Sequence, residues 1–247
     1  MHNSFLTHEI KNSFAPTGIL RASINVGNPI LAKRGGDNVG GVSVDLAQAF
    51  GDALGVEVEF KVFESARESV QAVSNNNADI GFFAIDPLRA NEIAFTPPYV
   101  LIEGSYLVAE NSALTSNHEV DAPGMRLVVG AGSAYDLFLS REIKHAEIIR
   151  SATSPTVVDT YVAISADVAA GVKQQLEADS QRLGGLRLLP GNFMVIRQAM
   201  GCSKSVPEAA IRFLRDFIEE KKSSGYVGES LIRNRIDGAT VAPPDGQ

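Results

Sequence analysis

Short apolar runs alternate with amphipathic stretches along most of the chain, and this pattern predicts strands followed by helices. In the first hundred residues or so, the expected strands are 21–26, 56–63 and 80–83, and the expected helices are 44–54 and 65–74. Gly55 suits the end of the first helix, and Ser65 with Glu68 has the spacing of a capping box at the start of the second. The alternation favours right-handed crossovers and a parallel sheet.

The middle of the chain repeats this alternation between two extended segments. Pro97 and Pro98 interrupt any helix and lead through 95–101 into a strand at 105–109, and 194–199 is expected to return antiparallel to it. The elements expected between them are strands at 126–129, 147–150 and 167–172 and helices at 133–142, 155–165 and 174–182. The middle segment is therefore predicted to be a second α/β lobe inserted into the first.

The sequence predicts different structures for the two ends of the chain. Residues 1–18 are polar and close on a Pro-Thr-Gly turn, so we expect a loose lead-in. Near the other end, Pro207 opens an amphipathic helix that stops at Gly225, and a shorter helix is expected around 227–233. The tail from Asp237 is expected to be frayed.

Two extended crossings between two lobes are what a hinge requires. The sequence thus predicts an α/β protein with a discontinuous lobe one, residues 1–103 and 196–247, and an inserted lobe two, residues 104–195. Each lobe is expected to hold a mainly parallel sheet flanked by helices. No repeat is visible at the sequence level, so the likeness of the two lobes is one of pattern only.

Composition narrows the classes of function. The chain carries 22 Lys and Arg against 29 Asp and Glu and has no basic cluster, which argues against binding to nucleic acid. A single cysteine, Cys202, excludes an internal disulfide, and four scattered histidines give no zinc-ligand spacing, so we expect neither a metal site nor a cofactor. No apolar run reaches the length of about 18 residues that a membrane-spanning helix needs.

The first candidate for ligand binding follows the strand at 80–83. Asp86 and Pro87 supply a helix N-cap and a first helical residue for a turn that carries Arg89. Ligands of open α/β sheets bind outside the carboxyl ends of the strands, where a planar guanidinium can hold an anion with two hydrogen bonds. A solvated salt bridge is the alternative role for Arg89. Asn28, in a turn after an earlier strand, is expected to face the same crevice.

Five short motifs occur in a characteristic order. They are GVSVDL at 41–46, ADI at 78–80, IDPLR at 85–89, FTPPY at 95–99 and GAGSAYD at 130–136. Together with the closing helix from Pro207, they resemble the polar amino acid branch of the periplasmic solute-binding proteins of ABC importers, and the similarity spans nearly the whole chain. The resemblance implies a two-lobed periplasmic-binding-protein type II fold that holds a small amino acid-like or carboxylate ligand in the cleft between its lobes.

The resemblance also implies ligand-binding residues in both lobes. Ser133 begins a helix after a glycine-containing loop, and its hydroxyl with the helix N–H groups resembles the second-lobe loop that grips a ligand carboxylate opposite the arginine. The expected ligand-binding residues are Asn28, Ser65, Phe83, Ala84, Asp86, Arg89, Gly132, Ser133, Ala134, Tyr135 and Lys173. Structural roles stay open for Ser65 and Ser133 as helix caps and for Phe83 and Tyr135 as core residues.

Two departures from the family pattern bear on the ligand. The family has hydroxyl residues five and three positions before the arginine, where this chain has Ala84 and Asp86. An acidic residue that pairs with the ligand ammonium is expected near the end of strand 167–172, where this chain has Lys173. Lys173 and Arg89 together would suit a dicarboxylate or another organic anion, whereas Asp86 would supply a negative charge for an amino acid. Lys173 is otherwise a solvated helix start.

The function predicted is that of the substrate-binding component of an ABC importer, a monomer that closes over its ligand and has a permease as partner. A dehydratase of the cyclohexadienyl dehydratase type is an alternative, because Asp86, Glu64 or Glu177 could serve as the acid, although none has an evident partner. A ligand-sensing module is a third. The resemblance implies a periplasmic location, but the N-terminal segment lacks an apolar secretory region, so a cytoplasmic location stays open.

Overall fold

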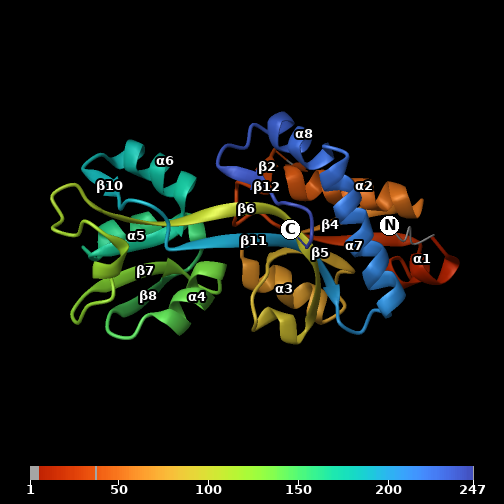
Figure 1. Ribbon diagram of the computed structural model, residues 1–247, viewed down its shortest axis with the longest axis horizontal. Helices are drawn as coiled ribbons and strands as arrows, with labels where there is room; N and C mark the ends of the chain where they lie inside the picture. The colour runs from red at the N-terminus through yellow and green to blue at the C-terminus, as the bar shows by residue number, and fades with distance from the viewer. Residues whose placement is uncertain (1–5, 37, 247) are drawn as a thin grey trace. The chain divides into compact units, whose positions relative to one another are not determined.

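The computed structural model describes residues 6–36 and 38–246, and the chain divides into two compact units (Figure 1). Unit 1 is Met1–Leu101 with Arg197–Gln247, and unit 2 is Ile102–Ile196. The chain passes from one unit to the other within two strands, β6 (Ile93–Ala109) and β11 (Met194–Ser203). Neither passage is made by a loop.

The sheet of unit 1 contains parallel strands, as predicted, together with an antiparallel one. Its strands follow the order β4 (Glu57–Phe63), β1 (Ile19–Asn25), β5 (Ile80–Ala84), β11 and β6, and β12 (Ala239–Val241) pairs with β6. The first three are parallel to one another, and β11 runs antiparallel to β5. A separate hairpin joins β2 (Lys33–Gly35) and β3 (Asn38–Gly40). The helices are α1 (His8–Phe14), α2 (Val42–Leu54), α3 (Ala66–Ser74), η1 (Arg89–Asn91), α7 (Glu208–Ser223) and α8 (Tyr226–Arg233).

Alternating side chains of β1 show how this sheet is covered on both faces. The hydroxyl of Ser23 lies 2.7 Å from that of Ser69 on α3, which places α3 on one face. Successive residues of a strand alternate between faces, so Leu20 and Ile24 point to the face opposite Ser23. Both are fully buried, so this face is covered as well. The sheet therefore forms the centre of unit 1, and its strand ends are the surface available for a site.

The N-terminal segment is more ordered than the sequence suggested. Residues 1–5 lie outside the described part, but α1 follows directly, with Thr7 as an N-cap that accepts a hydrogen bond from the N–H of Ile10. Ile10 and Phe14 are four residues apart, lie on one helix face and are buried. The ring of Phe14 meets that of Phe50 edge-on, with centroids 5.1 Å apart. The prediction of a loose lead-in was wrong, because this distant aromatic partner orders the helix.

The C-terminal tail is also ordered, so the prediction of fraying from Asp237 was wrong. Strand β12 pairs with β6, and the N–H of Ala242 donates to the carbonyl of Tyr99 over 3.0 Å. The ammonium of Lys222 donates to the carbonyl of Pro243 over 2.9 Å. Prolines cannot donate backbone hydrogen bonds, but their carbonyls still accept them, so the two prolines did not prevent attachment.

Unit 2 contains a second α/β sheet. Its strands follow the order β6, β9 (Val168–Val172), β7 (Arg126–Gly130) and β8 (Glu147–Ser151), and β10 (Leu186–Leu188) pairs with β6. The last three of that order are parallel, and β6 is antiparallel to β9. The helices are η2 (Asn117–Glu119), α4 (Ala134–Glu142), η3 (Ser154–Thr156), α5 (Val157–Ala163) and α6 (Lys173–Leu183).

One face of the unit 2 sheet packs against α5 and α6. Leu107 of β6, Val128 of β7 and Ala169 of β9 form a buried cluster with Val158 and Leu176 from these helices. Helix α4 instead contacts β7 and β8. The α/β class predicted from the sequence is confirmed, and the carboxyl ends of β7 and β9 meet at one edge of this sheet.

Candidate ligand-binding site

Arg89 lies in unit 1, just beyond the carboxyl end of β5. The Oδ1 atom of Asp86 accepts a hydrogen bond from the N–H of Leu88 over 2.8 Å, and this turn leads into η1, which begins at Arg89. The guanidinium folds back, and its Nη1 atom donates to the carbonyl of Ala84 over 3.2 Å. Ala84, Asp86 and Arg89, three of the predicted site residues, are therefore grouped at one strand end.

Arg89 is only 7% exposed, which is unusual for an arginine. Burial lowers the pKa of its guanidinium to about 10, and the charge of Asp86 acts in the opposite direction. The group therefore remains cationic at neutral pH. A buried cation with a planar fork of donors is well suited to holding a carboxylate.

Asn28 lies in the turn after β1, and its side-chain Oδ1 atom is buried with no hydrogen-bond partner among the described residues. The backbone of the preceding residue is tightly packed, since a Cβ atom added to Gly27 would lie 2.3 Å from the carbonyl oxygen of Glu64. The turn is therefore held against the end of β4. An unsatisfied buried acceptor is costly, so Asn28 is a reasonable place for a ligand donor.

Ser65 and Phe83 have structural roles that account for their positions. Ser65 is the N-cap of α3, accepting from the N–H of Glu68 and donating to its Oε2 atom over 2.9 Å. Phe83 is 2% exposed and packs in a core cluster with Val73 and Ile93. Their contribution to ligand binding therefore stays a prediction with a structural alternative for each.

The second group of predicted residues surrounds the start of α4 in unit 2. Ser133 is the N-cap and accepts a hydrogen bond from the N–H of Asp136. The carboxylate of Asp136 reaches back to the N–H of Gly132 over 2.8 Å, and the N–H of Ser133 donates to the carbonyl of Gly130. These two loop amides are thus engaged within the protein. The groups that remain for a ligand are the hydroxyl of Ser133 and the first-turn amides, beginning with Ala134.

Tyr135 lies in the first turn of α4 and is 3% exposed. Its ring packs over the backbone of Gly104, where an added Cβ would come within 2.4 Å of the tyrosine Cε1, and meets Phe193 with ring centroids 5.7 Å apart. The hydroxyl is buried with no partner among the described residues, and burial raises its pKa. The ring therefore belongs to a packed aromatic group, and its hydroxyl is a second unsatisfied polar atom.

Lys173 begins α6, immediately after β9, and its ammonium donates to the Oε2 atom of Glu103 over 2.8 Å. The side chain is thus held in an ion pair within unit 2. Sequence reasoning missed Glu103, because the two residues are brought together by the pairing of Gly104 with Val172 on neighbouring strands. It also missed Phe193, whose ring stacks on that of Tyr106 with centroids 4.3 Å apart.

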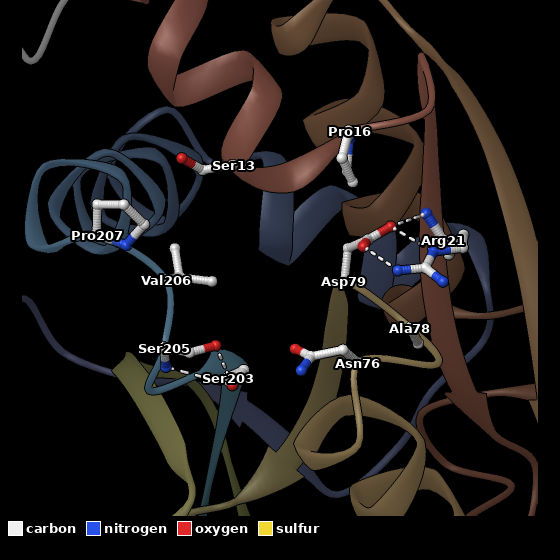
Figure 2. Close-up of a pocket in the computed structure, with 10 residues that line it drawn as sticks. All are labelled: Ser13, Pro16, Arg21, Asn76, Ala78, Asp79, Ser203, Ser205, Val206 and Pro207. Carbon is white, nitrogen blue, oxygen red and sulfur yellow. Dashed lines mark hydrogen bonds and ion pairs between the residues drawn. The ribbon is translucent and has the colours of Figure 1, made fainter.

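A pocket of about 270 Å³ lies elsewhere in unit 1, beside the start of β5 (Figure 2). One wall carries Arg21 and Asp79, joined by hydrogen bonds of 2.6 and 3.0 Å, and another carries Ser203 and Ser205, whose hydroxyls lie 2.8 Å apart (Figure 2). The charged side chains of Arg21 and Asp79 are therefore paired with each other. The pocket lies at the edge of the sheet opposite the one that carries Arg89, so it is not the predicted site.

Two further kinds of feature are absent from residues 6–36 and 38–246. No group of three or more His, Cys, Asp and Glu side chains is arranged to hold a metal ion in this part of the chain. None of the helices within the same residues is both long and apolar enough to span a membrane.

Residues 24–229 match the model of the bacterial extracellular solute-binding proteins, family 3. The chain belongs to this family. The match includes the Arg89 turn and the whole of unit 2, so both groups of candidate residues lie inside the family domain.

Solved structures with the type II periplasmic-binding-protein fold are similar over most of the chain. A binding component of an ABC transporter from Wolinella succinogenes, described as putative in its own name and complexed with lysine, is 22% identical, with a TM-score of 0.75 over 88% of this chain and 95% of that one. An ancestral amino acid-binding protein, described as a precursor of cyclohexadienyl dehydratase, is 18% identical, with a TM-score of 0.76 over 92% and 99%. At these identities the likeness shows the fold.

One curated relative matches a shorter segment. The membrane-bound lytic murein transglycosylase F of Cronobacter sakazakii is 35% identical over 63 residues, which is 26% of this chain and 12% of the transglycosylase. The chain thus spans about an eighth of the length of that enzyme.

Proposed function

We propose that this family 3 solute-binding protein binds a small amino acid-like or carboxylate ligand and delivers it to an ABC permease. The observation that carries the proposal is the buried guanidinium of Arg89 at the carboxyl end of β5. A guanidinium carries five N–H donors in a planar fork, and a carboxylate is the group that it holds with two parallel hydrogen bonds. The lysine complex of the similar Wolinella protein supports an amino acid as the class of ligand.

Particular side chains of each unit are candidates for ligand contacts. Arg89 binds the ligand carboxylate, and Asn28 accepts a hydrogen bond from the ligand through its unpartnered Oδ1 atom. From unit 2, Ser133 donates its hydroxyl and the first-turn amide of Ala134 adds a second donor.

The test is a thermal-shift screen against the twenty standard L-amino acids, succinate and glutarate. A ligand at one hundred times its Kd stabilises the native protein by about 2.7 kcal/mol, which raises the melting temperature by several degrees in a protein of this size. We expect at least one amino acid to do so. If none of these compounds raises the melting temperature, the proposal is wrong.

Substitution of Arg89 tests its role. Arg89→Lys keeps the charge but lacks the planar fork, and we expect it to lower the affinity for the ligand with the largest thermal shift by roughly tenfold or more. We expect Arg89→Ala to abolish the thermal shift that this ligand causes. The control is Arg67→Ala, which removes an exposed arginine from α3 in the same unit. Full affinity in the Arg89→Lys protein, folded as judged by its melting transition, would remove Arg89 from the site.

Dehydratase activity is the second candidate, because the ancestral relative is described as a precursor of cyclohexadienyl dehydratase. Of the acids that could serve, Glu64 is exposed and paired with Arg34 over 2.8 Å, and Asp86 accepts from the backbone of its own turn. An enzyme would consume prephenate, which can be followed by its ultraviolet absorbance. Unchanged absorbance, together with an amino acid-induced thermal shift, favours the binding protein.

We further propose a periplasmic location, a monomeric state and an ABC permease as partner, on the basis of the extracellular family. Cell fractionation, light scattering of the purified protein and co-purification with a permease test these three statements separately. A ligand-sensing role would instead predict a signalling partner in the co-purification.

A further inference from the structure

The edge of the unit 2 sheet that carries Ser133 also carries an acidic residue. Strands β7 and β9 are parallel and end at this edge, at Gly130 and Val172. Strand β6 runs antiparallel to β9, with Gly104 paired to Val172, so Glu103 lies beside the first turn of α6. The topology thus brings a carboxylate from a third strand to the edge at which α4 and α6 begin.

The ion pair at this edge determines which charge a ligand meets. Lys173 is the first residue of α6, where the helix dipole disfavours a cation, and the first turn of α6 contains no acidic residue. The carboxylate of Glu103 compensates, with its Oε2 atom 2.8 Å from the ammonium of Lys173. The contact raises the pKa of Lys173 and lowers that of Glu103, so both stay ionised at neutral pH. Lys173 therefore already has a carboxylate partner within unit 2.

Glu103 keeps the capacity to accept further hydrogen bonds. Besides Lys173, its carboxylate accepts one long hydrogen bond of 3.4 Å from the amide of Asn192, and its side chain is 42% exposed. A carboxylate has about four acceptor positions, so some remain. The next residue on α6, Gln174, has a buried Oε1 atom with no partner among the described residues. This edge therefore offers acceptors, which a ligand that carries N–H groups would satisfy.

We propose that Glu103 is the unit 2 residue that selects a ligand with an amino group, and that Lys173 positions Glu103 instead of binding the ligand. The inference rests on the proposed function and specifies its ligand class, an amino acid in preference to a dicarboxylate. Lys173 alone would suggest that an anionic group of the ligand binds at this edge, whereas Glu103 favours a cationic one.

The ion pair is exposed enough for its removal to leave the fold intact. Exposed ion pairs contribute little to stability, so variants at either position are expected to melt within a few degrees of the unaltered protein. A change in affinity can then be assigned to the ligand contact. Asp159, which pairs with Arg182 over 2.8 Å in the same unit, is a matched exposed carboxylate for a control.

The experiment measures Kd by calorimetry for the amino acid that gives the largest thermal shift, for the same molecule without its α-amino group, and for glutarate. We expect Glu103→Gln to raise the Kd for the amino acid by roughly tenfold or more. The Kd for the des-amino analogue should change by less than about threefold. We expect Lys173→Met to raise the Kd for the amino acid less than Glu103→Gln does. Asp159→Asn should leave this Kd unchanged.

Three outcomes would overturn the inference. Unchanged amino acid affinity in a folded Glu103→Gln protein would leave the proposed function standing and remove Glu103 from recognition. If glutarate instead binds the unaltered protein more tightly than any amino acid, and if Lys173→Met abolishes this binding, then Lys173 is an anion-binding residue. If the unaltered protein binds none of the twenty amino acids, the amino acid function fails, and this inference fails with it.

Discussion

Arg150 of β8 holds the carboxylate of Asp136 on α4, with its Nε atom 3.0 and 3.1 Å from the two carboxylate oxygens. The same carboxylate accepts from the N–H of Gly132 and from the hydroxyl of Ser140, and it is almost completely buried. One acidic side chain therefore joins the loop after β7, the first turns of α4 and the neighbouring strand. The shape of the loop before Ser133 depends on it.

We predict that Asp136→Ala lowers the free energy of unfolding by about 2 kcal/mol, because the hydrogen bonds that this buried carboxylate accepts from Gly132, Ser140 and Arg150 are lost. Urea denaturation measures the change. Asp159→Ala is the control, since that carboxylate is exposed and its loss is expected to cost less than about 1 kcal/mol. Equal effects of the two substitutions would contradict the role given to Asp136.

Helix α1 is expected to be part of the cooperative fold of unit 1. Phe14 is fully buried against Phe50, so Phe14→Ala should destabilise the protein by about 3–5 kcal/mol. Asn12→Ala changes an exposed residue of the same helix and should cost far less. The melting temperatures of the two variants distinguish them, and similar values would show that α1 contributes little.

The turn at Gly27 is expected to reject any side chain. A Cβ at this position would lie 2.3 Å from the carbonyl oxygen of Glu64, and backbone cannot move aside as a flexible side chain can. We predict that Gly27→Ala destabilises by about 1–3 kcal/mol and weakens ligand binding by displacing Asn28. Gly40→Ala, where a Cβ would meet nothing within 4 Å, should be nearly neutral in chemical denaturation. A neutral Gly27→Ala would disprove the tight approach.

The buried thiol of Cys202 gives a prediction for alkaline pH. Burial raises its pKa from 9.0 to about 12, so the native state keeps its proton after the unfolded state has lost it. This stabilisation is fully present below pH 9 and is lost as the pH rises through 12. At pH 10 the loss attributable to this group is about 1.4 kcal/mol.

The measurement compares urea denaturation at pH 8 and pH 10 for the unaltered protein and for Cys202→Ala. Other groups titrate in both proteins, so the difference between their pH dependences isolates the thiol. We expect the variant to lose less stability than the unaltered protein over this interval. Identical losses would show that the thiol ionises equally in both states.

Local signals in the sequence were sufficient for most of the elements. Gly55 ends α2 in the left-handed conformation with φ of 64°, and Ser65 caps α3, because both features depend on neighbouring residues alone. The alternation of apolar runs likewise predicted parallel strands in both units. These predictions needed no knowledge of distant contacts.

Features that depend on distant contacts were not predicted. Helix α1 is ordered by Phe50, and the C-terminal tail by a strand that precedes it by about 140 residues. The Glu103–Lys173 pair requires the register of β6 against β9, which no local pattern determines. For the candidate site, the sequence located residues at strand and helix ends, but not the partners that change what those residues can bind.

The discontinuous composition of unit 1 has a consequence for biosynthesis. Translation makes all of Ile102–Ile196 before it makes Gln198–Gly201, the part of β11 that pairs with β5. Unit 2 can therefore form its native contacts first, although its gene segment is read second. Until residues 198–201 are translated, the edge of β5 in the nascent chain lacks its β11 partner and is open to pairing with another strand.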